Sequence, residues 1–473
     1  MFSAKISRII LSVASAGAGK SAITLGLMAA LRKQGLSVSC CLSGESWRQA
    51  PLFTRLSGRS ARVLDQAILN PEHLRLALCQ ASLGSDVVIV EGHQLTQQEG
   101  EGAAGQSSDA YLAALTGTPI VLVADFSLEP TLAFGLVADM LSRPGTPPIA
   151  GIIANRVPDA LDVELLRNRL RDGGLPPLLG AVPEDPRLSG FPSAELPQRA
   201  GSVSLPPTFL SEAGGLIDHC VDLEALLGVA SKAEQIQAEG DAPQTAGRTC
   251  RFAVSDDICF NVSYPDNIDL LRLAGAWIVP FSPVADSKLP QQIDGIYLTN
   301  AFLHEYGADL ARNEHMHRAI RQFVDGGGVV YSEAAGSAFL CRSFQLEPGG
   351  ERFQGAGAIP AEAVAAQDGQ AYCFSADLVD DSVLGMTGVS VRGRKLGEWS
   401  LGAALVGAVG RLPTAMRIHT PLGGALLEGY SASAQSFNTF ELLHFGASPE
   451  VARALVEAAQ VVQRARNRAS RRD

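Results

Sequence analysis

The segment 14–21, Ala-Ser-Ala-Gly-Ala-Gly-Lys-Ser, holds the residues whose types and spacing point most clearly to chemistry. Its two glycines let the backbone curl so that successive N–H groups point at one anion. Lys20 can then reach the β- and γ-phosphates of a nucleoside triphosphate, and the Ser21 hydroxyl can ligate Mg²⁺. The nucleotide is predicted to bind Ala16, Gly17, Ala18, Gly19, Lys20, Ser21 and Ala22.

A phosphate-binding loop needs a strand before it and a helix after it. The apolar run Ile9–Val13 predicts a buried strand, and Ala22–Leu31 has helical spacing that stops before Gly35. The first motif position is Ala14 where the strict pattern has glycine, and the looser form of the pattern tolerates this. The flanking elements favour a phosphate loop over a glycine-rich turn that matches by chance.

Two polar residues close later strand patterns, and the carboxyl edge of a parallel sheet is where ligands bind. Glu91 is predicted to hold Mg²⁺ opposite Ser21 and to act with Lys20 in catalysis. A solvated strand end is the alternative for Glu91. Asn155 is predicted to contact the nucleotide by reading a purine edge, or simply begins a turn.

Alternating strand and helix patterns predict an α/β fold with two doubly wound domains, the first containing a parallel sheet. The first domain is predicted at 1–231 and the second at 250–458. Residues 232–249 are rich in Glu, Gln, Ala, Gly and Pro, which predicts an interdomain linker. Residues 459–473 are predicted to form a basic tail after a helix, either a frayed end or an interaction tail.

Composition narrows the classes of function. The net charge of −11 argues against a nucleic-acid binder. No apolar stretch is long enough to span a bilayer, and the first residues lack the features of a signal peptide. The eight cysteines form neither a Cys-x-x-Cys pair nor a disulfide framework. These features predict a cytoplasmic protein without a membrane or nucleic-acid partner.

The order of motifs resembles the cobyrinic acid a,c-diamide synthase family, which joins a dethiobiotin-synthetase-type domain to a glutamine amidotransferase domain. The resemblance rests on the phosphate loop, Glu91-Gly92, Gly151–Arg156 and, in the second half, Asp257–Asn267. It implies ATP with Mg²⁺, phosphoryl transfer to a carboxylate of a corrinoid or related tetrapyrrole, and attack of ammonia on the acyl phosphate. It also implies a flavodoxin-like, amidotransferase-type second domain and a homodimer.

The glutaminase residues implied by this resemblance are missing. The nucleophilic cysteine of the family falls at Ala334, and a methyl group cannot attack a carboxamide. Thr299–His304 replaces the family's oxyanion segment, and Leu442 stands where the general-base histidine is expected, leaving His444. We therefore predict that ammonia, either free or from a separate source, replaces glutamine hydrolysed in this domain.

Departures in the first domain bear on the substrate. Ser46 stands where the family has a metal-site aspartate, with Glu45 as a possible substitute. The loop from His93 is polar where the family is glycine-rich, and Arg199–Val203 also differs. The alternative function is a nucleotide-binding switch or scaffold with an inactive amidotransferase domain, which would bind nucleotide without substrate-dependent turnover.

Three further side chains are predicted to take no part in catalysis or metal binding. Cys341 is predicted to be a core cysteine rather than a replacement nucleophile. His315 and His317 are two residues apart on a predicted helix, so they point to different faces. They are predicted to be solvated rather than to bind a metal.

Overall fold

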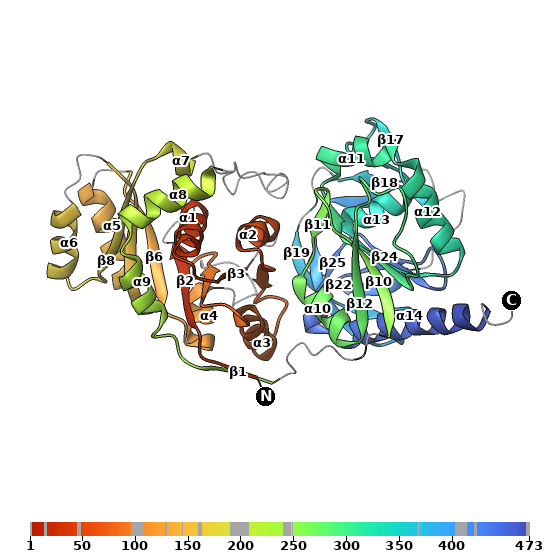
Figure 1. The fold of residues 1–473 in the computed structure, drawn as a ribbon, viewed down its shortest axis with the longest axis horizontal. Coiled ribbons are helices and arrows are strands. Elements are labelled where there is room, and N and C mark those ends of the chain that lie inside the picture. Colours follow the sequence, from red (N-terminus) through yellow and green to blue (C-terminus); the bar gives the residue numbers. More distant parts are fainter. Residues whose placement is uncertain are drawn as a thin grey trace. The chain divides into compact units, whose positions relative to one another are not determined.

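The computed structural model describes residues 2–13, 17–44, 49–95, 108–127, 130–143, 145–158, 163–189, 208–239, 247, 249–366, 369, 371–402, 414–420 and 423–469. The chain divides into two units, Met1–Ala242 and Pro243–Asp473, each with its own sheet (Figure 1). The division falls inside the segment predicted as a linker. No helix among the described residues has both the length and the apolar character needed to cross a membrane.

The first unit contains a seven-stranded sheet in the order β4-β3-β5-β2-β6-β7-β8, and every neighbouring pair in it is parallel. Its strands are β2 (Ser7–Val13), β3 (Val38–Ser43), β4 (Arg62–Leu64), β5 (Val87–Glu91), β6 (Ile120–Asp125), β7 (Ile149–Val157) and β8 (Leu178–Pro183). A separate antiparallel pair joins β1 (Phe2–Ala4) to β9 (Ile236–Ala238). Strand β9 thus belongs to this unit, although the sequence placed it in the linker.

Helices follow most of these strands, as parallel connections require. They are α1 (Lys20–Lys33), α2 (Ala50–Ser57), α3 (Pro71–Ser82), α4 (Asp109–Thr116), α5 (Pro130–Ser142), α6 (Val163–Asp172), α7 (Pro186–Ser189), α8 (Phe209–Cys220) and α9 (Leu223–Ala230). Strands β3 and β5 are buried at every residue, as expected where helices cover both faces of a sheet. Strand β2 lies between β5 and β6, so the loop that follows it opens at the point where the strand order reverses.

The second unit contains a ten-stranded mixed sheet in the order β12-β10-β13-β15-β24-β23-β22-β19-β20-β25. Pairing is parallel from β12 to β24 and antiparallel beyond. The sheet strands are β10 (Cys250–Ser255), β12 (Ala276–Phe281), β13 (Gly295–Leu298), β15 (Val329–Glu333), β19 (Tyr372–Leu378), β20 (Ser390–Lys395), β22 (Thr414–His419), β23 (Ala425–Tyr430), β24 (Ser436–Thr439) and β25 (Leu442–Leu443). The antiparallel half was not predicted.

Smaller elements complete this unit. The minor strands are β11 (Phe260–Val262), β14 (Asn300–Ala301), β16 (Cys341–Gln345), β17 (Arg352–Gln354), β18 (Ile359–Ala365) and β21 (Trp399–Leu401). The helices are α10 (Pro265–Leu273), α11 (Leu303–Arg312), α12 (Glu314–Asp325), α13 (Ala334–Leu340) and α14 (Glu450–Ala469).

The alternation of side chains along β10 separates two cores. Phe252 and Val254 belong to a cluster that includes residues of α10 and α14, whereas Ala253 belongs to one that includes residues of α11, α12 and α13. Helices therefore cover both faces of the parallel half, as a doubly wound domain requires. Helix α14 continues to Ala469, so the prediction of a tail from residue 459 is wrong for residues 459–469.

Candidate functional site

Strands β2 and β5 and helix α1 bring the predicted phosphate and metal residues together. Lys20 Nζ lies 3.0 Å from Glu91 Oε1, and Ser21 Oγ donates to the same oxygen at 2.5 Å. The second carboxylate oxygen, Glu91 Oε2, is buried and has no hydrogen-bond partner among the described residues. A buried carboxylate oxygen left in this state is costly unless a cation binds it, and Mg²⁺ takes oxygen ligands of this kind.

The backbone of the loop has the conformation that an anion cradle needs. Gly17 and Gly19 have φ values of +82° and +79°, in the left-handed region that glycine tolerates. No described side chain caps the N-terminus of α1, so its first N–H groups can serve an anion. Ala18 and Ala22 are buried and can contribute only through their backbone. The predicted contact Ala16 lies outside the described residues.

Asn155 supports the phosphate loop through a hydrogen bond of its side chain. Its Nδ2 donates to the Ala18 carbonyl at 2.8 Å, and the side chain is buried. A Cβ on Gly19 would lie 2.3 Å from the same Nδ2, so glycine is needed there for close approach as well as for φ. Strand β7 continues to Val157, so Asn155 does not begin a turn. Its predicted nucleotide contact stays a prediction.

Asp109, which the sequence analysis missed, links the ends of strands β2 and β5. Its carboxylate accepts from Ser12 Oγ at 2.6 Å and from the His93 N–H at 3.0 Å, and it is fully buried. A Cβ on Gly92 would lie 2.1 Å from Asp109 Oδ2, so the residue after Glu91 packs directly on this carboxylate. Burial raises the pKa of Asp109, although the bonds from Ser12 and His93 oppose the rise. The only sequence signal was an acidic residue at a helix start.

The guanidinium group of Arg156 also lies beside the phosphate loop. Arg156 has a φ of +54° and forms an ion pair with Asp125 at 2.8 Å. Its Nη2 lies 3.8 Å from where a Cβ on Gly19 would be. Burial alone would raise the pKa of Asp125, but hydrogen bonds from Ser127 and the charge of Arg156 outweigh it and lower that pKa. Arg156 stood in the quoted motif, yet the sequence assigned it no role.

The second unit contains a sharp turn from strand to helix. Strand β15 ends at Glu333, α13 begins at Ala334, and Ala334 has a φ of +46°. A strained residue between a strand and a helix is the geometry that presents a nucleophile at an elbow, but here the side chain is a methyl group. Leu442 and His444 are both buried, and the His444 ring lies 4.2 Å from that of Tyr264.

The other sequence candidates have mixed outcomes. Cys341 is fully buried, as predicted, and burial raises the pKa of its thiol. His315 is exposed, but His317 is buried with Nε2 2.9 Å from the Leu310 carbonyl, so the prediction that both are solvated is wrong. Over the described part of the chain, no group of three residues is placed to hold a metal ion. Glu45, Ser46 and residues 199–203 lie outside the described residues.

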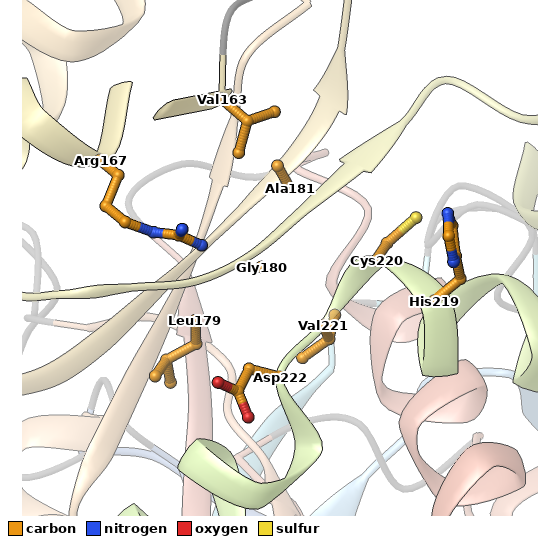
Figure 2. Close-up of a pocket in the computed structure, with 9 residues that line it drawn as sticks. All are labelled: Val163, Arg167, Leu179, Gly180, Ala181, His219, Cys220, Val221 and Asp222. Atoms are coloured by element: carbon orange, nitrogen blue, oxygen red, sulfur yellow. The ribbon is translucent and has the colours of Figure 1, made fainter. Parts of the chain in front are cut away.

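A pocket of about 420 Å³ lies at the sheet-edge strand β8 (Figure 2). Both of its charged side chains already have partners: Arg167 pairs with Glu164 at 2.6 Å, and Asp222 caps α9 through the Ala225 N–H. None of the residues predicted to bind nucleotide or metal lines this pocket. Its lining residues are Val163, Arg167, Leu179, Gly180, Ala181, His219, Cys220, Val221 and Asp222.

The fold and the two sites together define a class, the phosphate-loop α/β proteins that carry an amidotransferase-like second unit. A family model described as a CobB/CobQ-like glutamine amidotransferase domain matches residues 251–386. The cobyrinate a,c-diamide synthase of Magnetococcus marinus is 30% identical, covering 78% of this chain and 80% of its own length. That of Syntrophotalea carbinolica is 28% identical over 95% of this chain and 98% of its own.

A hydrogenobyrinate a,c-diamide synthase of Streptomyces coelicolor is 27% identical over 96% of this chain and 97% of its own. This chain belongs to the cobyrinate a,c-diamide synthase family. The family predicted from the sequence motifs is therefore confirmed, and with it the ligase class of the protein.

Proposed function

We propose that this protein catalyses the ATP-dependent amidation of carboxylates on a corrin-type tetrapyrrole, with ammonia as the nitrogen donor. The observation that carries the proposal is the convergence of Lys20, Ser21 and Glu91 at the carboxyl edge of a parallel sheet, with Glu91 Oε2 buried and unpaired. The relatives act, by their names, on cobyrinate and hydrogenobyrinate, and "a,c-diamide" denotes two amidated positions. A corrin carrying free carboxylates is the matching substrate class.

Each part of the site has a task in this reaction. The loop N–H groups and the Lys20 ammonium bind the phosphates, and Ser21 and Glu91 hold the metal. Mg²⁺, when bound, neutralises the charge on the transferring phosphoryl group. Asn155 and Asp109 hold the loop and the end of β5 in place. Preorganised groups of this kind cost no rearrangement during the reaction.

The proposed reaction has two steps, phosphoryl transfer to the carboxylate and then amide formation. A substrate carboxylate oxygen attacks the γ-phosphorus of ATP, the bond to the β–γ bridging oxygen breaks, and ADP leaves. The acyl phosphate is then attacked at its carbonyl carbon by ammonia, inorganic phosphate leaves, and the nitrogen loses a proton to give the amide. Activation is needed because a free carboxylate does not react with ammonia.

The second unit supports ammonia as the nitrogen donor. Ala334 at the elbow lacks the thiol that would form the covalent intermediate of glutamine hydrolysis, which favours ammonia from solution or from a separate protein. We also propose, from the family resemblance, a cytoplasmic protein that works as a homodimer. A solution measurement of mass would test the dimer.

The decisive experiment measures ADP release at mildly alkaline pH with cobyrinic acid or hydrogenobyrinic acid. Ammonium chloride and glutamine are compared as donors, and Lys20→Ala serves as the blank. We expect substrate-dependent turnover with ammonium chloride and none with glutamine. Turnover with glutamine alone would overturn the choice of donor. Tight nucleotide binding without substrate-dependent turnover would overturn the ligase proposal and favour the nucleotide-binding switch or scaffold.

A further inference from the structure

The elbow in the second unit has an unexpected hydrogen-bond acceptor beside it. Asn300 Oδ1 accepts from the Ala335 N–H at 3.1 Å and from the Ala301 N–H at 2.9 Å. Ala335 directly follows the elbow residue, and Ala301 lies on β14, which approaches the elbow from a different segment. Asn300 is 6% exposed, so these two hydrogen bonds are buried.

Two backbone donors in this arrangement have a known chemical use. In enzymes with a nucleophile elbow, the N–H of the residue after the nucleophile and a second N–H from a nearby loop bind the developing oxyanion. Here the Ala301 and Ala335 N–H groups both donate to Asn300 Oδ1. The asparagine side chain is one methylene shorter than that of glutamine and ends in the same carboxamide. Asn300 therefore places inside the fold the group that a glutamine substrate would bring.

The surrounding packing leaves this arrangement little freedom. A Cβ on Gly336 would lie 2.5 Å from the Thr299 carbonyl oxygen, so the first turn of α13 presses against the segment that carries Asn300. Ser332 Oγ and Ser337 Oγ lie 2.7 Å apart and further tie β15 to α13. The strained φ of +46° at Ala334 is thus maintained although no nucleophile needs it.

We propose that Asn300 determines the nitrogen donor: its carboxamide occupies the oxyanion hole of the second unit and excludes glutamine. The amide nitrogen then enters the reaction only as ammonia. The choice of donor rests on the proposed function, but the block is a property of the second unit and is tested there without ATP or a tetrapyrrole. It also implies that the missing cysteine and the missing general base at Leu442 are not the only obstacles to glutamine chemistry.

The test restores the nucleophile with and without Asn300. The full-length variants Ala334→Cys and Ala334→Cys/Asn300→Gly are treated with a chloroketone analogue of glutamine, and covalent modification is followed by intact mass. In this reaction the Cys thiol loses its proton to solvent, the thiolate sulfur forms a bond to the chloromethyl carbon, and chloride leaves, so no proton has to be returned by a general base at position 442. Each rate is divided by the rate with iodoacetamide, which corrects for the reactivity of the thiol.

We expect the double variant to react about 100-fold faster than the single variant, the range associated with an oxyanion-hole donor. The wild-type chain gives the background from its own eight cysteines. Ala334→Cys/Asn438→Ala is the matched control, because Asn438 is a buried asparagine on β24 that binds Tyr430 and Ser332 but not Ala335. It should react as slowly as the single variant.

Equal corrected rates in the single and double variants, whether both fast or both undetectable, would overturn the proposal. A fast rate in the Asn438 control would also overturn it, because general loosening of the elbow would then explain the effect. Circular dichroism of each variant shows whether it is folded, and Asn300→Ser in the same background provides a second removal of the carboxamide. Failure here would leave ammonia-dependent ligase turnover in the first unit untouched.

Discussion

At the scale of single residues, the two carboxylate oxygens of Glu91 have different surroundings in the phosphate site. Glu91 Oε1 already accepts from Lys20 and Ser21, whereas Oε2 is buried without a described partner. We expect Glu91→Gln to lower ADP release about 100-fold or more and to raise the Mg²⁺ concentration needed for half-maximal turnover, because a neutral amide is a poorer ligand for a hard cation. A Mg²⁺ titration of ADP release measures both effects.

The other end of the same strand provides the control for Glu91. Asp86 precedes β5, is exposed, and its carboxylate accepts from the Ser37 N–H at 2.7 Å. Asp86→Asn should leave the Mg²⁺ titration unchanged. If both variants shift it equally, net charge rather than metal ligation determines the Mg²⁺ dependence.

Asp109 gives a second prediction at this scale. Asparagine has the same size but only one acceptor oxygen, so Asp109→Asn leaves either Ser12 Oγ or the His93 N–H facing an amide nitrogen. We expect the free energy of unfolding of the first unit to fall by about 1–3 kcal/mol, measured by urea denaturation. Ser12→Ala should cost clearly less in the Asp109→Asn background than in the wild type. Additive costs would show that the two side chains are not coupled.

At the scale of elements, α1 begins at the phosphate loop and is positioned from behind by α8. A Cβ on Gly214 would lie 3.0 Å from Ala29 Cβ and 3.1 Å from its carbonyl carbon, so the two helices touch through their backbones. Gly214→Leu should force them apart, lowering the free energy of unfolding by about 1–3 kcal/mol and weakening ATP binding. Thermal unfolding and nucleotide titration measure the two effects.

The neighbouring glycine makes this prediction sharp. A Cβ on Gly215 meets nothing within 4 Å, and leucine has a higher helix propensity than glycine by nearly 1 kcal/mol. Gly215→Leu should therefore be neutral or stabilising with unchanged nucleotide affinity. Similar losses in the two variants would mean that α8 does not position α1.

Elements also show where sequence reasoning succeeded and where it could not. The phosphate loop was predictable because strand, glycines, lysine and helix are contiguous in the chain. Asp109 was not, because Ser12 lies 97 residues away and meets it only once the strand order is known. Helix α14 was predicted too short because its arginines suggested a solvated tail, whereas Arg466 donates to the Ile293 carbonyl and pairs with Asp294. The antiparallel strands β19 to β25 lacked a strong pattern.

At the scale of the whole molecule, the second unit contains buried carboxyl groups with raised pKa values, which should make its stability depend on pH. Glu333 is fully buried and accepts from Tyr331 and Tyr297 hydroxyls at 2.6 Å each and from the Leu443 N–H at 3.1 Å. Burial raises the pKa of Glu333 to about 7, against the opposing effect of these bonds. Burial likewise raises the pKa of Glu428 to about 7.

The direction of the pH effect follows from linkage. An unfolded glutamate loses its proton near its ordinary pKa of 4.5, whereas the folded Glu333 keeps its proton up to about pH 7. Between these values the folded state binds more protons, so the free energy of unfolding falls as pH rises and levels off above about 7. The loss for one such group is on the order of 3 kcal/mol.

Glu333→Gln cannot ionise, so it should remove the part of this pH dependence that Glu333 contributes. The parts due to Glu428, Glu441 and Asp294, whose pKa values burial also raises, should remain. The free energy of unfolding of this variant at low pH should be lower than that of the wild type. The Tyr297 and Tyr331 hydroxyls donate to different oxygens of Glu333, and glutamine has only one such oxygen. The slope, and not the level, is therefore the informative quantity. Chemical denaturation at a series of pH values from 5 to 8 measures it, with exposed Glu457→Gln as the control. An unchanged slope in Glu333→Gln would mean that this carboxyl group is already ionised across the range, held by its two tyrosines.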